Sequence, residues 1–206
     1  MQPTKTLPQS YSLAWAVDIK KDTRLNIVLQ IAGAGWFFVF GWLLWLVVHL
    51  MRPDFMPRAL FDVALSSLAA ILLSLFVVLL LHEMVHGAFF LLFTGERPKF
   101  GVGPGYAYAA APEWYFPKRQ YLVVGLAPLV ALTVLGLLVI ALIPAGWVGL
   151  VFLGIAFNAG GAVGDIYICI RIGAEAGNIW VKDKGDGFEV YRQQAEGSAR
   201  MKFPAW

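Results

Sequence analysis

Four long apolar runs limit what this chain can fold into more than any other feature of its sequence. Hydrophobic residues make up 59% of the 206 residues and charged residues only 14%, a composition that excludes an ordinary soluble domain. A helix needs about 20 apolar residues to cross a hydrocarbon core of about 30 Å. Four runs meet this length, and the sequence therefore predicts an all-α membrane protein with four transmembrane helices, at residues 25–50, 63–93, 121–143 and 147–170.

The basic residues between these runs predict the orientation of the helices. Lysine and arginine gather before the first run, in the loop at residues 94–120 and from Arg171 onward, whereas residues 144–146 contain none. Cytoplasmic loops are enriched in Lys and Arg, so both termini and the long middle loop are expected in the cytoplasm. The predicted organisation is a cytoplasmic N-terminal segment, a transmembrane domain and a cytoplasmic C-terminal tail, at residues 1–24, 25–171 and 172–206.

The net charge of +3 and the isoelectric point near 9.0 are explained by these basic flanks, which would face the anionic headgroups of the lipid bilayer. No nucleic-acid partner is needed to account for them. The chain has one cysteine, Cys169, so an intramolecular disulfide and a CxxC metal site are both excluded.

The segment LHEMVHG, residues 81–87, places three ionisable side chains inside the second apolar run. His82 and His86 are four residues apart, so on a helix they share one face with Cβ atoms about 5–6 Å apart. That spacing suits two imidazoles on one Zn²⁺ ion, with Glu83 as the general base for a metal-bound water, as in H-E-x-x-H metalloproteases. The alternative is a set of polar side chains that satisfies a helix interface or lines a pore. A charged residue at mid-membrane costs on the order of 2.5–3.5 kcal/mol, which favours a shared metal ion.

A catalytic zinc ion normally has three protein ligands, so a third is expected at similar depth. Within the fourth run the candidate is Asp165, in the segment NAGGAVGDIYI. At about 1.5 Å per residue, the middle of HEMVH lies about 13 Å from Phe93, and Asp165 lies about 9 Å from Arg171. Both distances start from the predicted cytoplasmic face. The sequence therefore predicts His82, His86 and Asp165 as metal ligands, while an interhelical hydrogen bond is the other reading of Asp165.

Other residues of the fourth run have supporting roles in this prediction. Asn158 is two turns before Asp165 and is expected either to hydrogen-bond a substrate backbone or a metal ligand, or simply to pack. Small residues let membrane helices approach closely, so the neighbouring glycines are expected to bring this helix against the second one. These are Gly160, Gly161 and Gly164. Cys169 is one turn beyond Asp165 and reads as a buried apolar residue more readily than as a ligand.

The loop at residues 94–120 is rich in Gly, Pro and aromatic residues, and residues 105–109 alternate in a weak strand-like pattern. One interpretation is a re-entrant hairpin beside the metal that pairs edge-on with an extended substrate. The other is an interfacial loop anchored at headgroup level by its aromatic residues, Trp114, Tyr115 and Phe116. Glu113 is a further, weaker candidate for a ligand or a catalytic group.

An H-E-x-x-H motif in one apolar helix with an aspartate in a later one resembles the site-2 protease group of intramembrane zinc metalloproteases. More closely, three segments resemble the bacterial DUF3267 family of zincin-type peptidases: LHEMVHGAFFLLFTGERPKF, YAYAAAPEWYFPKRQYLVVGLAPL and NAGGAVGDIYI. The resemblance implies zinc ligands at His82, His86 and Asp165, a water-activating role for Glu83, and a place in the bacterial cytoplasmic membrane. It departs from the better-studied site-2 proteases at Gly164-Asp165-Ile166, where their aspartate motif is closer to N-P-D-G, and at residues 125–129, which lack the asparagine of their G-P-x-x-N element.

The expected activity is peptide hydrolysis in or near a transmembrane segment by a zinc metallopeptidase whose active site lies towards the cytoplasm. The expected partners are a membrane-protein or membrane-adjacent peptide substrate and the bilayer. A metal-binding membrane protein without hydrolytic activity, such as a carrier or an inactive protease scaffold, is the alternative, and it has no need of Glu83. A proton or ion path is disfavoured because the chain has one ionisable cluster in its four runs.

Overall fold

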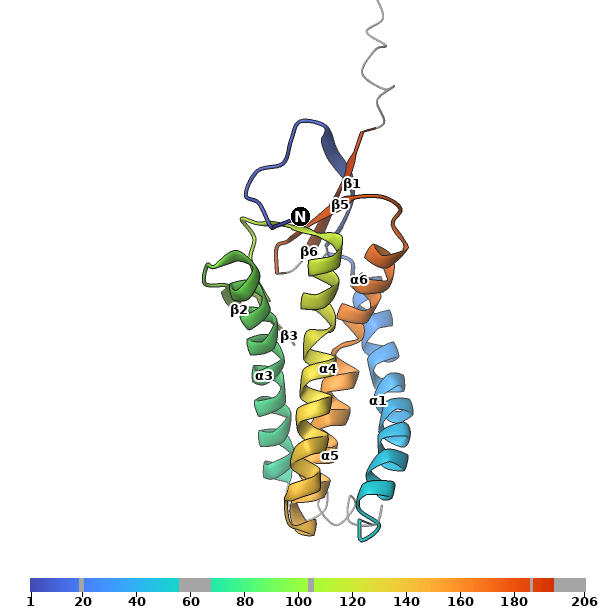
Figure 1. Cartoon of the computed structure of the whole chain (residues 1–206). Coiled ribbons are helices and arrows are strands. Elements are labelled where there is room, and N and C mark those ends of the chain that lie inside the picture. Colours follow the sequence, from blue (N-terminus) through green and yellow to red (C-terminus); the bar gives the residue numbers. More distant parts are fainter. Residues whose placement is uncertain (19–20, 56–67, 104–105, 186, 195–206) are drawn as a thin grey trace, which may run out of the picture.

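A bundle of long helices with a small antiparallel sheet at one end forms the computed structural model of this chain (Figure 1). The structure describes residues 1–18, 21–55, 68–103, 106–185 and 187–194. Its helices are α1 (Thr23–Met51), α3 (Leu68–Thr94), α4 (Lys118–Leu142), α5 (Ala145–Gly161) and α6 (Val163–Ala174).

Three of these helices, α1, α3 and α4, are each long and apolar enough to cross a membrane. Their outer faces expose large apolar side chains, and Ile31 and Leu92 are 68% and 72% exposed, as expected where the surrounding solvent is lipid rather than water. The predicted runs at residues 25–50 and 121–143 match α1 and α4 closely. The second run matches α3 from Leu68 onward, and residues 63–67 lie outside the described part of the chain.

The fourth predicted span is not one straight helix. It divides into α5 and α6, which are bent by 43° and together have the length and composition of a span. The bend falls at Ala162, directly after the pair Gly160-Gly161, and paired small residues of this kind are a common cause of sharp helix kinks. The break places Asp165 in the first turn of α6, where a carboxylate is favoured by the helix dipole.

The glycines of this segment do not have the contacts that the sequence predicted. A Cβ built on Gly160 would lie 3.2 Å from the carbonyl oxygen of Gly33, so Gly160 packs on α1 rather than on α3. A Cβ built on Gly161 or Gly164 would contact no other part of the described chain within 4 Å. The close approach to α3 is made instead by Gly154, beside Val78 and Ser74. Helix packing needs small residues at the contact itself, and on α5 that residue is Gly154.

The all-α fold class is wrong, because the described residues also form two sheets. One has four antiparallel strands in the order β1-β6-β5-β4, and the other pairs β2 with β3. The strands are β1 (Tyr11–Asp18), β2 (Lys99–Gly103), β3 (Tyr106–Ala110), β4 (Tyr115–Pro117), β5 (Ile179–Asp183) and β6 (Gly187–Gln193).

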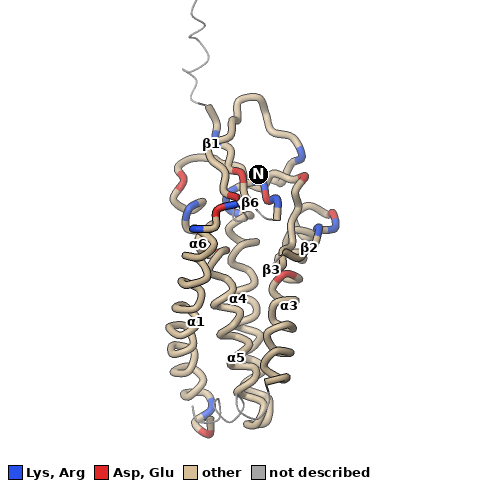
Figure 2. Tube along the Cα trace, turned by 180° about the vertical axis from the view of Figure 1, so that it is seen from behind, with Lys and Arg blue, Asp and Glu red and all other residues tan. Residues whose placement is uncertain are grey.

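The larger sheet joins segments from the beginning, middle and end of the chain. β1 precedes the first span, β4 lies between the second and third, and β5 and β6 follow the last, so their pairing required contacts that no local apolar run predicts. Lys, Arg, Asp and Glu gather at this end of the bundle (Figure 2). Residues 94–120 likewise form strands, with β3 covering most of the segment whose alternation predicted one.

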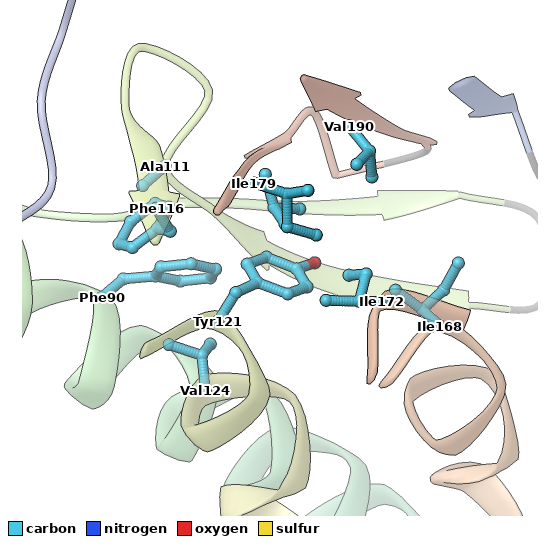
Figure 3. Packing of buried hydrophobic residues seen from close by; sticks show 10 residues of the cluster. Phe90, Ala111, Phe116, Tyr121, Val124, Ile168, Ile172, Ile179 and Val190 are labelled. Carbon is cyan, nitrogen blue, oxygen red and sulfur yellow. The ribbon is translucent and has the colours of Figure 1, made fainter. Parts of the chain in front are cut away.

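A buried cluster attaches this sheet to the helices (Figure 3). Phe90 of α3, Phe116 of β4 and Tyr121 of α4 stack in a row of tilted rings, with centroids 5.2 Å and 6.3 Å apart. Phe116 is one of the three aromatic residues that one interpretation placed at headgroup level. It is fully buried and is therefore a core residue. The cluster also includes Ile168 and Ile172 of α6 and three residues of β5 and β6. It fixes the ends of α3, α4 and α6 against one another. The strand residues are Ile179, Val181 and Val190.

Candidate metal centre

The two histidines of the HEMVH motif lie on one face of α3, as their spacing predicted. Their ring centroids are 4.9 Å apart, and His82 and His86 are only 7% and 8% exposed. Each buried ring nitrogen of these two imidazoles requires a partner.

Asp165 of α6 supplies a carboxylate that faces both rings. Its Oδ2 lies 3.1 Å from His82 Nε2 and its Oδ1 lies 3.5 Å from His86 Nε2. One donor atom from each of the three residues can be chosen so that all lie within 4.8 Å of one another. Residues 83 positions apart in the sequence therefore converge at one point, as the depth comparison predicted.

The second ring nitrogen of His82 is held by Asn158 of α5. Asn158 Oδ1 lies 2.9 Å from His82 Nδ1, and the Asn158 amide nitrogen donates to the Pro128 carbonyl at 3.1 Å. Because the amide oxygen can only accept, Nδ1 carries a proton, and Nε2, on the side of Asp165, is the nitrogen that could bind a metal ion. A ligating histidine usually has its other nitrogen bonded in this way.

The second ring nitrogen of His86 is held by backbone rather than by a side chain. His86 Nδ1 lies 3.0 Å from the carbonyl oxygen of Val124 in α4. In a regular helix this carbonyl would accept from the N–H of residue 128, but that residue is Pro128, which has no N–H. The proline therefore leaves the Val124 carbonyl available, and His86 Nε2 also keeps its lone pair for a metal.

These donors fit a zinc ion. Two neutral imidazoles and one carboxylate are a common ligand set for catalytic zinc, which keeps its fourth position for water. The carboxylate also offsets the charge of a divalent cation in a low-dielectric site. The part of the chain that the structure describes shows no other group of three or more such donors.

Glu83 lines the same cavity as the three donors. Its side chain is half-buried, and its carboxylate accepts a hydrogen bond from the backbone N–H of Ala109 in β3. A carboxylate next to a ligand histidine and on the cavity wall is placed to accept a proton from a water at the site.

The cavity has a volume of about 790 Å³ and lies between α1, α3, α4, α5, α6 and β3. Near the sheet its walls carry His82, Glu83, Asp165 and Asp183. Deeper in the bundle they become apolar, with Phe37, Phe38, Leu75, Val78 and Phe157. One end of the cavity is thus suited to polar peptide groups and the other to apolar side chains.

The sequence did not predict a role for Asp183, which lies in β5 and is only 6% exposed. It accepts hydrogen bonds from the Tyr121 hydroxyl and from the Gly185 N–H, both at 2.7 Å. Burial raises the pKa of Asp183 to about 6. Its sequence signal was the short apolar run Ile-Trp-Val just before it and the turn after it, which together indicate a strand end.

Two weaker ligand candidates lie apart from the donor group. Cys169 is buried in α6 with its Sγ against Gly125, where a built Cβ would approach it to 2.5 Å. Glu113 is exposed and pairs with Lys99 at 3.1 Å. Neither lines the cavity among the described residues.

Comparison with known proteins agrees with this chemistry. A family model, DUF3267, described as "Putative zincin peptidase", matches residues 75–175, which include both histidines, Glu83, Asn158 and Asp165. Comparisons with the curated proteins and with the solved structures give no significant match. The chain therefore belongs to the DUF3267 family, through a domain that spans residues 75–175.

Proposed function

We propose that this protein is an intramembrane zinc metallopeptidase of the site-2 protease kind, which hydrolyses a peptide bond in or next to a transmembrane segment. The observation that carries the proposal is the convergence of His82, His86 and Asp165 within 4.8 Å, inside a bundle of membrane-length helices. The Nδ1 positions of both histidines are occupied by acceptors, so their Nε2 atoms are left for the metal.

The residues around the donors have distinct parts in this reaction. A zinc ion bound by His82, His86 and Asp165 supplies a Lewis acid and an activated water. Glu83 accepts the proton of the attacking water and returns it to the leaving amine. Asn158 and the Val124 carbonyl keep the two imidazoles in their tautomer and orientation.

The hairpin β2–β3 supports a peptide substrate in this proposal. Within the described residues β3 pairs with β2 along one edge, and Ala107 and Ala109 of β3 line the cavity. The other edge of such a strand can hydrogen-bond an extended peptide by strand addition. A helical substrate would first unwind, because the bonds of an intact helix occupy its peptide groups.

We further propose that the sheet end of the bundle faces the cytoplasm. Lys118 and Arg171 lie at this end of α4 and α6, and Lys and Arg gather there in general (Figure 2). Juxtamembrane lysine and arginine favour the cytoplasmic side. Both termini and the metal centre would then open towards water of the cytoplasm, with a bacterial cytoplasmic membrane as the setting.

The test compares zinc content with hydrolysis in the full chain. Wild type is expected to hold one zinc ion, H82A and D165A to lose it, and E83Q to keep it. The hydrolysis probe is a labelled peptide of about 20 apolar residues, reconstituted in liposomes. A helix-breaking Asn-Pro pair lies within one third of the length of this peptide. E83Q is expected to lose cleavage of this probe, whereas the exposed control E113Q keeps it.

Each result has a clear meaning. Zinc retained in both H82A and D165A would overturn the metal centre. Cleavage by E83Q at the wild-type rate would overturn the hydrolytic role and leave the alternative, a protein that binds metal without catalysis.

A further inference from the structure

One wall of the catalytic cavity comes from α1, which lies outside the family-matched residues 75–175. The cavity-lining residues of α1 recur every three or four positions, so a single face of this helix lines the cavity along about 18 Å. They are Asn26, Leu29, Gln30, Gly33, Ala34, Phe37 and Phe38. Figure 2 shows α1 and the β2–β3 hairpin on opposite sides of the bundle.

This wall carries two amides, Asn26 and Gln30, one helical turn apart. Neither side chain has a hydrogen-bond partner within residues 1–18, 21–55, 68–103, 106–185 and 187–194. Asn26 is half-buried and Gln30 is exposed at the cavity, so the amide groups of both side chains can hydrogen-bond an occupant of the cavity.

The amides lie at the depth of the metal donors. α1 meets α5 where a Cβ on Gly33 would come within 2.8 Å of the Gly160 carbonyl oxygen, which sets a common level for the two helices. From this level towards the sheet, Gln30 is about 4.5 Å away, Asp165 about 7.5 Å and Asn26 about 10.5 Å, at 1.5 Å per residue. Asn26 and Gln30 therefore bracket Asp165.

From this placement we infer that Asn26 and Gln30 are a substrate-binding pair for the backbone of the unwound peptide segment, an inference that rests on the proposed function. Each amide offers both a donor and an acceptor, which matches the N–H and C=O of a peptide group. The β3 edge would satisfy one side of the extended segment and the α1 amides the other. Recognition of this kind reads the backbone, so it tolerates many side chains.

The apolar part of the same cavity gives the substrate its class. Phe37, Phe38 and Leu75 line the deeper end, where the continuing apolar helix of the substrate packs. The occupant is a transmembrane segment whose end nearest the sheet is extended and whose remainder stays helical. A soluble peptide would fill only the polar end.

The test measures binding of the labelled Asn-Pro peptide probe to the catalytically blocked E83Q protein in nanodiscs. The double substitution N26L/Q30L is expected to weaken binding about tenfold, because the hydrogen bonds of two amides to the peptide backbone are lost. An apolar effect alone would strengthen binding of an apolar peptide. The control V28L changes a lipid-facing residue of the same turn, 53% exposed, and is expected to leave binding unchanged.

Zinc content is measured on the same samples and is expected to stay the same. Binding within twofold of E83Q with full zinc would overturn this inference and leave the proposed function standing, since that depends on its own zinc and E83Q results. A second experiment serves if the double variant fails to fold. It places a photo-crosslinking side chain at position 26, 28 or 30 of the otherwise unaltered E83Q protein. Crosslinks to the probe from 26 and 30 but not from 28 support the pair, and their absence overturns it.

Discussion

Pro128 lies one helical turn after Val124 in α4, and because the proline has no N–H, the Val124 carbonyl accepts its hydrogen bond from His86 instead. The carbonyl of Pro128 itself accepts from Asn158, which holds His82. A single turn of α4 thereby orients both imidazoles of a motif carried by another helix. Positioning groups of this kind matter to a metal site nearly as much as its ligands.

Replacing Pro128 is expected to lower zinc affinity without lowering thermal stability. P128A restores an N–H that competes with His86 for the Val124 carbonyl, so zinc affinity is expected to fall about tenfold. The same change removes a helix-interior proline, so thermal stability is expected to stay equal or rise. Zinc titration and thermal unfolding in detergent check the two effects. The control V130A, on the lipid-facing side of α4, is expected to change neither zinc affinity nor fold.

Asn158 gives a second test of the same principle. N158L removes the acceptor for His82 Nδ1 and is expected to lower zinc affinity about 10- to 100-fold. N158D keeps an acceptor at that atom but loses the donor to Pro128, so zinc affinity is expected to stay close to wild type while stability falls. Equal zinc affinity in N158L and wild type would show that the hydrogen bond at 2.9 Å has no influence on the metal.

The helices were predictable because their information is local. A run of apolar residues long enough to cross the bilayer indicates a span whatever the rest of the chain does, and α1, α3 and α4 follow the predicted runs. The strand β1 was missed because Tyr11–Asp18 pairs with residues about 175 positions later, and short half-exposed strands carry a weak pattern. Two features of the sequence could have indicated β1. They are the alternation around Trp15 and the turn before Gly187, where its partner strand β6 begins.

The contact of α1 with the broken span is tested by two glycines of α1. A Cβ on Gly33 would lie 2.8 Å from the Gly160 carbonyl oxygen, whereas a Cβ on Gly35 would have no neighbour within 4 Å in the part of the chain that the structure describes. G33A is therefore expected to destabilise the protein by roughly 1–3 kcal/mol through overpacking. G35A is expected to be neutral or slightly stabilising, because alanine is the better helix former. Thermal unfolding of both variants in one detergent decides, and equal melting temperatures would contradict the packing.

Asp183 predicts how stability depends on pH. Its folded pKa of about 6 lies above the value of about 3.9 in an unfolded chain, so the folded protein holds this proton more tightly. The resulting stabilisation is complete below about pH 4 and is lost as the pH rises through 6. Tyr121 of α4 donates to this carboxylate, and the charges of His86 and Asp165 also act on it.

The variant D183N cannot ionise, so its stability relative to wild type is expected to increase between pH 4.5 and pH 7.5. Melting temperatures of both proteins at the two pH values give this difference directly. The exposed control E113Q is expected to show no comparable change. A constant difference between D183N and wild type would mean that Asp183 stays ionised when buried.

The candidate site was predictable to the extent that chemistry appears as side chains in a pattern. His82, Glu83, His86 and Asp165 could be proposed because ionisable residues are rare in apolar helices. The role of the Val124 carbonyl could not be predicted, because the residue type does not specify what a backbone oxygen binds. Pro128 inside an apolar run was the sequence feature that could have indicated it. Asp183 could not be placed because its burial depends on a sheet formed by distant segments.

The position of β6 in this sheet has a consequence for biosynthesis. β6 pairs with β1 and β5, and its Phe188 lines the cavity together with Asp183 and Gly185. Residues 187–193 leave the ribosome after all the helices, so every candidate metal donor is synthesised before the strand that forms part of the cavity wall. Complete enclosure of the centre therefore waits for this strand to emerge and pair with β1 and β5.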